Sequence, residues 1–449
     1  MSPTYRRPSL LDLPDEILLQ ILAYLRIIRS YKTQSQAFRL KQEEITRQSK
    51  NRQREAAFYS LCLTSKRLHR VATPVLYEAF VNTTTWQGFK PLCLFLRTIS
   101  QCSSLAYHVQ YIENRLWDYL GNGLYDDLEF YGATEMVREY YETLATVIRL
   151  CRNISHLTVV SLETAEVSLW RGLIQLKSSP TQMASHGFLK LHTLCLQIHT
   201  EDYGLGEESS WFRRIANALL TVPTLKTLRA SGVTSGDSAF VTGEYQSLET
   251  IDISECILDF DEVVQIASAS PKLKHFGCSW AYLNSQGFHL PDLYASLNTQ
   301  KKSLEYLCLD TREVRFCAED FPFQPFGSIR DFEALKTIEM CEMSLLANTM
   351  SLLDFPDQRL PIRISELLPP CLESLSIMVK SEYGYNDDCR VDEVFALWDL
   401  ADDCSKMLPY LRKVQIKSVY ELSALLLTSR YREVGVTLSL VKEQINHYD

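Results

Sequence analysis

The sequence predicts an α/β protein in which an N-terminal helical module is followed by an irregular solenoid of strand-plus-helix repeats. Two apolar segments with helical spacing lie within the first 80 of the 449 residues. A leucine-rich hexad then recurs nine times, and helix-compatible segments such as residues 211–220 and 262–269 separate its copies. One short strand plus one helix cannot bury its apolar face alone, so such units stack around a continuous core.

The first helix is expected to begin directly after Leu13. Pro14 suits the first helical position, and the acidic residues at 15 and 16 follow in the first turn, near the positive end of the helix dipole. Apolar residues then recur at the spacing of one wide helical stripe, at Ile17, Leu18, Ile21, Leu22 and Leu25.

A second apolar helix is expected from residue 61 onward. Its apolar positions are Leu61, Leu63, Leu68 and Val71. Because a residue that precedes a proline is disfavoured in the α region, Thr73 before Pro74 predicts the end of this helix.

These two segments together resemble the F-box family. The family pattern is matched at Leu13, Pro14, Glu16, Ile17, Leu18, Ile21, Leu25, Leu61, Leu63, Ser65, Lys66, Arg67, Leu68, Ala72, Pro74, Leu76 and Tyr77. Thr64 departs from the usual small apolar residue, and a long insert replaces the family's short Asp-Leu linker. The resemblance implies a three-helix module that docks onto a Skp-type adaptor of a cullin–RING ubiquitin ligase.

The resemblance also implies which residues meet the adaptor. Carried over position by position, they are Leu13, Pro14, Ile17, Leu18 and Ile21. Binding would place an apolar helical face in a groove, with a few buried anchors dominating the affinity. The alternative is that the same stripe is the internal core of a helical N-terminal domain.

The F-box-like module is predicted to span residues 1–80, with a basic insert at 26–57. Through residue 80 the chain carries fourteen Lys and Arg against seven Asp and Glu, a net charge of +7. The insert is rich in Gln, Ser, Arg and Lys and lacks Pro and Gly, which suits a solvated helix or a loop. A nucleic-acid site would need stacking aromatics beside the basic residues, and only Tyr31 and Phe38 lie nearby, so no such partner is expected.

The leucine hexad dominates residues 81–449. Its nine copies start at residues 154, 191, 225, 248, 273, 304, 335, 372 and 411, which are 23 to 39 residues apart. The hexad resembles the leucine-rich repeat, although most of these spacings exceed the usual 20–29 residues and so require longer loops or extra helical turns. An ordinary α/β domain with leucine-rich strands is the alternative. Residues 109–112 and 435–441 suit a degenerate first strand and a closing strand, the latter preceded by a helix over 422–429.

An acidic insert is predicted at 381–403, between the eighth and ninth hexads. Its acidic residues are Glu382, Asp387, Asp388, Asp392, Glu393, Asp399, Asp402 and Asp403. Long insertions in solenoids often serve binding, so this segment is expected either to capture a basic part of a client protein or to be a solvated loop.

No pattern in the sequence indicates catalysis, a cofactor or a metal ion. Nucleotide-binding glycine runs, a nucleophile elbow and a zinc-binding helix motif are all missing from the sequence. The thirteen cysteines include no C-x-x-C pair, which favours reduced thiols in a cytoplasmic or nuclear protein. Neither a membrane-spanning segment nor a signal peptide is expected, because no apolar run is long enough and no apolar stretch follows Arg7.

The sequence therefore predicts a non-catalytic substrate-recognition subunit of a Skp–cullin–F-box type ubiquitin ligase. A protein client would bind strand positions that flank the buried leucines, namely Arg229, Asp252, His275, Tyr306, Asp310, Glu339, Lys413 and Gln415. Two alternatives remain, a repeat scaffold that acts outside ubiquitin ligation and a repeat-based GTPase regulator.

Overall fold

The structure is a computed structural model of the chain. It describes residues 10–31, 41–82, 89–115, 130–162, 167–174, 188–199, 211–236, 241–281, 283–285, 290–316, 326–346, 352–353, 360, 362–380 and 389–443. The chain divides into two compact units, residues 1–225 and 226–449.

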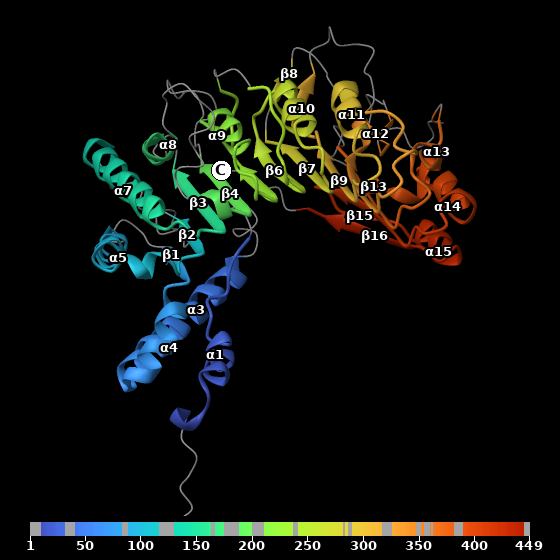
Figure 1. The fold of residues 1–449 in the computed structure, drawn as a ribbon. Coiled ribbons are helices and arrows are strands. Elements are labelled where there is room, and N and C mark those ends of the chain that lie inside the picture. The colour runs from blue at the N-terminus through green and yellow to red at the C-terminus, as the bar shows by residue number, and fades with distance from the viewer. Residues whose placement is uncertain are drawn as a thin grey trace, which may run out of the picture. The chain divides into compact units, whose positions relative to one another are not determined.

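The first unit begins with a small helical module around its own apolar core. Its elements are the 3-10 turn η1 (Leu10–Asp12), α1 (Asp15–Ala23), α3 (Lys41–Thr64) and α4 (Lys66–Leu76) (Figure 1). The buried core consists of Leu18, Leu22, Phe58, Leu68, Val71 and Ala72. The side chain of Ser65 caps α4 by accepting a hydrogen bond from the backbone N–H of Leu68 at 3.1 Å.

Two local expectations for these helices are corrected. The helix α4 does not end at Thr73 but continues through Pro74 to Leu76. Only two residues of the helix, Val75 and Leu76, follow the proline, so the distortion costs few intrahelical hydrogen bonds. Pro14 is the N-cap residue of α1 rather than its first helical residue, with an extended ψ of 154°.

The rest of the first unit is a parallel sheet whose connections are helical. Its strands pair in the order β1 (Ala79–Asn82), β2 (Tyr111–Arg115), β3 (His156–Leu162) and β4 (Thr193–His199). Its helices are α5 (Phe89–Gln101), α6 (Ser103–Ala106), α7 (Phe130–Leu150), α8 (Val167–Leu173), η5 (Phe188–Lys190) and α9 (Phe212–Leu219). The strand β1 crosses the predicted module boundary at residue 80.

The second unit also consists of parallel strands, and helices are described in most of their connections. Its parallel strands are β5 (Thr227–Ser231), β6 (Thr250–Cys256), β7 (His275–Trp280), β9 (Tyr306–Asp310), β11 (Thr337–Cys341), β12 (Ser374–Met378), β14 (Lys413–Ser418) and β16 (Thr437–Lys442). The helices are α10 (Phe260–Ser268), α11 (Leu290–Asn298), α12 (Glu342–Leu346), α13 (Ile364–Leu367), α14 (Phe395–Met407) and α15 (Leu426–Glu433), with the 3-10 turn η7 (Val391–Glu393). Two short pairs complete it, β8 (Leu283–Ser285) with β10 (Val314–Phe316) and β13 (Cys389–Arg390) with β15 (Leu422–Ser423).

Every hexad coincides with one of these parallel strands, and the strands inferred at 109–112 and 435–441 overlap β2 and β16. The predicted α/β class is therefore confirmed, and the parallel strands with helical connections are compatible with a repeat solenoid. Buried aliphatic residues alternate with more exposed residues along the strands, as in β9 and β14.

Two expectations in the second unit are corrected. The helix predicted over 422–429 starts only at Leu426, because residues 422–423 pair with β13. The acidic segment 381–403 is not a loop in its described part: residues 389–403 form β13, η7 and most of α14. Glu382, Asp387 and Asp388 lie outside the described residues. Asp403 is buried on α14, where it accepts hydrogen bonds from Arg363 and Ser365.

The residues that directly precede the seven parallel strands from β5 to β14 form a row of alternating charge. In strand order they are Lys226, Glu249, Lys274, Glu305, Lys336, Glu373 and Arg412. From the second residue on, each backbone N–H donates to the carbonyl of the residue before it in this row, at 2.7–2.9 Å. We call this row the charge ladder. Ion pairs join two adjacent couples, Lys274–Glu249 at 2.8 Å and Lys336–Glu373 at 3.8 Å.

Candidate functional site

Helix α1 presents two different apolar faces. Leu18 and Leu22, four residues apart, are each 2% exposed and point into the core of the module. Ile17, Ile21 and Tyr24 follow one another at spacings of four and three residues, and are 38%, 39% and 82% exposed. Since residues three and four apart share a helix face, these three side chains form one exposed row, which we call the α1 stripe.

The structure separates the five predicted adaptor-binding residues into two groups. Pro14, Ile17 and Ile21 are exposed, whereas Leu13 is half-buried against the module core. Leu18 is buried beneath the helix and is not accessible to a partner in this arrangement. Tyr24 was not among the predicted residues, although its spacing from Ile17 and Ile21 was visible in the sequence.

An ion-pair cluster fixes the start of α1 on α4. Arg67 donates to the Asp15 carboxylate at 2.7 Å and to the Leu13 carbonyl at 2.6 Å, and Arg70 donates to the same carboxylate at 2.6 Å. The hydrogen bond from Arg67 is the main reason why the pKa of Asp15 is lowered. This cluster ties Leu13 and Asp15 to α4.

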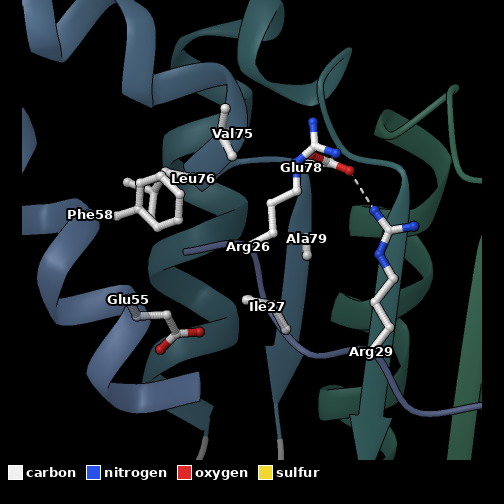
Figure 2. A pocket seen from close by; sticks show the side chains of 9 residues that line it. All are labelled: Arg26, Ile27, Arg29, Glu55, Phe58, Val75, Leu76, Glu78 and Ala79. Carbon is white, nitrogen blue, oxygen red and sulfur yellow. Dashed lines mark hydrogen bonds and ion pairs between the residues drawn. The ribbon is translucent and has the colours of Figure 1, made fainter. Parts of the chain in front are cut away.

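A pocket lies beside this module, between α3, α4, β1 and the segment that follows α1 (Figure 2). It encloses about 320 Å³, including the solvent at its mouth, and is lined by Arg26, Ile27, Arg29, Glu55, Phe58, Val75, Leu76, Glu78 and Ala79. Glu78 is paired with Arg26 at 3.1 Å and with Arg29 at 2.5 Å. Burial raises the pKa of Glu55, and the charge of Arg52 opposes this effect. The lining contains no histidine and no hydroxyl or thiol side chain.

The predicted client-binding residues lie in register on the strands of the second unit. Arg229 pairs with Asp252 at 3.7 Å. The Tyr306 hydroxyl donates to Glu339 at 3.3 Å, and its ring stacks on His275 with the centroids 6.0 Å apart.

Further predicted client residues have partners that the sequence analysis missed. Glu339 forms an ion pair with Lys417, which lies two strands away on β14. Asp310 is bound by Arg312 at 2.6 Å, and Gln415 accepts a hydrogen bond from Ser376 at 3.3 Å. Lys413 is exposed at the start of β14. The strand rows thus form a polar surface of partly buried, mutually paired charges, which we call the client face.

Two cysteines on the strands of the second unit, Cys278 and Cys308, have raised thiol pKa values. Burial raises the pKa of the Cys278 thiol well above 9.0, and that of Cys308 is raised for the same reason. A thiol with a raised pKa stays protonated at neutral pH and is a poor nucleophile. Among the described residues no cluster of three His, Cys, Asp or Glu side chains is placed to hold a metal ion. In the same part of the chain, none of the helices has both the length and the apolar character needed to cross a membrane.

These features define an α/β protein with an apolar row on a small helical module and a polar face on parallel strands. No family model matches the chain, and no curated protein matches it. A crystal structure of a protein from Bacteroides fragilis is similar at 13% identity, with a TM-score of 0.33, over 66% of this chain and 76% of that one.

Proposed function

We propose that this protein is the substrate-recognition subunit of a Skp–cullin–F-box type ubiquitin ligase. Its N-terminal helices would be an F-box-like module that binds a Skp-type adaptor, and its strand-and-helix units would be an irregular leucine-rich-repeat solenoid that binds a protein client. The protein would carry out no bond chemistry itself.

The α1 stripe is the observation that carries this proposal. A nine-residue helix that already buries Leu18 and Leu22 has no structural need for further large apolar side chains. Ile17, Ile21 and Tyr24 are nevertheless exposed on one face. An exposed apolar row of this spacing is the usual form in which an amphipathic helix enters a partner's groove.

The client face supports the second half of the proposal. Its charges are held by neighbouring strands, so a client would meet groups that are already oriented and would lose less side-chain entropy on binding. Holding a client lysine near a charged ubiquitin-conjugating enzyme would raise the local concentration of the reacting groups. This role requires two binding surfaces and no catalytic residue.

The test compares three single substitutions on α1 for binding to a purified Skp-type adaptor. Ile17→Ser and Ile21→Ser alter the α1 stripe, whereas Leu19→Ser alters a residue of similar exposure, 45%, on another side of the same helix. We expect each stripe variant to raise the Kd at least about tenfold, because each removes one apolar anchor from the contact. Leu19→Ser should change it less than about twofold.

Isothermal titration calorimetry measures these constants, and circular dichroism verifies that each variant is folded. An absence of binding by the unaltered protein would overturn the proposal. Equal losses for all three variants would show that the α1 stripe is not the contact.

A further inference from the structure

The basic insert is not a solvated appendage, because one face of α3 binds the sheet of the first unit. Arg47 donates to both carboxylate oxygens of Glu113 on β2, at 2.7 and 3.1 Å. It also donates to the backbone carbonyl of Ile28 at 2.8 Å, and to Glu44 on its own helix. Glu113 and Arg115, a second partner of its carboxylate, are 0% and 1% exposed. The expectation of a fully solvated insert is therefore wrong for this helix.

A second set of bonds ties the extended segment after α1 to the same place. The backbone N–H of Ile28 donates to Asn51 Oδ1 at 2.8 Å, and Asn51 Nδ2 donates to the Ile28 carbonyl at 3.1 Å. The backbone N–H of Ser30 donates to the Tyr111 hydroxyl at 2.9 Å, and that hydroxyl lies 2.6 Å from Glu113 Oε2, to which it can donate. Asn51, Ser30 and Tyr111 are all buried.

The end of this segment extends the contact to the next two strands. The Tyr31 ring meets His156 of β3 edge-on at 4.7 Å, and His156 stacks on Tyr111 at 4.7 Å. The Cys195 thiol of β4 lies 3.8 Å from the Tyr31 carbonyl. The register pairs Tyr111 with His156, so these contacts follow one face of the sheet. Phe38, the other aromatic residue of the insert, lies outside the described residues.

We propose that residues 26–31 and α3 form a built-in occupant of the polar face of β2–β4. This brace closes that face to other proteins and holds the helical module against the first strands. Arg47 is its centre, because this side chain of α3 donates hydrogen bonds both to the extended segment, at the Ile28 carbonyl, and to Glu113 on β2. Asn51 and Tyr111 form hydrogen bonds with backbone groups of Ile28 and Ser30. The contact therefore recognises the backbone of the extended segment.

The brace makes a sharp prediction for amide exchange. Residues 28 and 30 belong to no helix or strand, so the protection of their amides against hydrogen exchange reports the contact with Asn51 and Tyr111. Arg47→Met should accelerate exchange at both amides by about tenfold or more, which corresponds to the loss of a bond worth about 1.4 kcal/mol. Lys50→Met, an exposed substitution on the same helix, is the matched control and should leave both rates unchanged.

A second variant protects the test against misfolding of the first. Arg47→Met leaves Glu113 with one fewer partner in a buried site, so it could lower overall stability. Asn51→Ala removes only the two bonds to Ile28, and should accelerate exchange at residue 28 more than at residue 30.

Two results would overturn the brace. One is hydrogen exchange of the residue 28 and 30 amides at unprotected rates in the unaltered protein. The other is retained protection of both amides in a folded Arg47→Met or Asn51→Ala variant. Adaptor affinity should be unchanged in Asn51→Ala, because the α1 stripe makes none of these bonds. Failure of the brace proposal can therefore be distinguished from failure of the proposed function.

Discussion

Glu113 shows how a buried charge is kept ionised in this protein. Burial on its own would raise its pKa, but the charges of Arg115 and Arg47 and the hydrogen bonds from Arg47 and Tyr111 outweigh burial. The pKa is therefore lowered from 4.5 to about 2. A lowered folded-state pKa means that the ionised form favours the folded protein, and protonation removes this contribution.

Acidification should consequently weaken the first unit through Glu113. The contribution is complete above pH 4.5, the pKa of an unperturbed Glu, and is lost as the pH falls from there towards about 2. Urea midpoints measured from pH 6 to 3 should fall less steeply in Glu113→Gln than in the unaltered protein. Parallel curves for the two proteins would contradict this assignment.

Gly172 is required for a close approach between two helices. A Cβ atom at this position of α8 would lie 2.8 Å from the Cβ of Ala145 on α7. Gly172→Ala should therefore destabilise the protein by about 1–3 kcal/mol, the usual cost of overpacking. Chemical denaturation measures the loss.

Ala145→Gly provides the matched rescue for this clash. In Gly172→Ala/Ala145→Gly the opposing methyl group is absent, so the double variant should lose less stability than the two single losses added together. Strict additivity would show that the two positions do not meet.

The sequence alone did not show which apolar residues of α1 face the core and which face outward. The apolar stripe of Ile17, Leu18, Ile21 and Leu22 is wider than one contact face, so periodicity alone did not show which members face the core. Only the positions of α3 and α4 assign Leu18 and Leu22 to the interior and leave Ile17 and Ile21 outside.

At the scale of elements, the strands were the most predictable feature. Each hexad fixes a strand because its leucines alternate with polar residues over the length of one short strand. The four-residue strand β1 was missed, since it buries only Phe80 and Asn82. The burial of α3 was also missed, because Arg47 and Glu113 are 66 residues apart and no local pattern relates them.

The charge ladder should contribute to stability in a salt-dependent way. Glu305 lies between Lys274 and Lys336 in this row, so Glu305→Lys places three positive charges in succession. We expect a lower urea midpoint than for Glu305→Gln, which removes the charge without reversing it. Added salt at about 0.5 M should bring the two variants together, because exposed charges are screened.

A difference between Glu305→Lys and Glu305→Gln that persists at high salt would have another origin. It would indicate a packing effect of the longer lysine side chain rather than repulsion along the ladder. The comparison at low and high salt therefore isolates the electrostatic contribution of residue 305 to stability.

At the scale of the whole molecule, the two proposed binding surfaces belong to different compact units. The α1 stripe lies in residues 1–225, and the predicted client residues from Arg229 to Gln415 lie in residues 226–449. The equivalent strand face of the first unit is already occupied by residues 26–31, which is consistent with client recognition by the second unit alone.

Adaptor binding should therefore be insensitive to changes on the client face. Glu339→Ala/Lys417→Ala removes both members of an ion pair, so neither charge is left without its partner. We expect the Kd for the Skp-type adaptor to change less than about twofold in this variant, as measured by calorimetry. A tenfold change would mean that the two surfaces are energetically coupled.

The charge ladder also restricts how the number of repeats can change. Removing residues 274–304 would delete one repeat and bring Glu249 next to Glu305, so that two negative charges would become neighbours. Removing residues 274–335 would delete two repeats and bring Glu249 next to Lys336, which restores an attractive neighbour. Because the sign alternates, removal of two adjacent repeats preserves attractive neighbours along the charge ladder, whereas removal of one repeat does not.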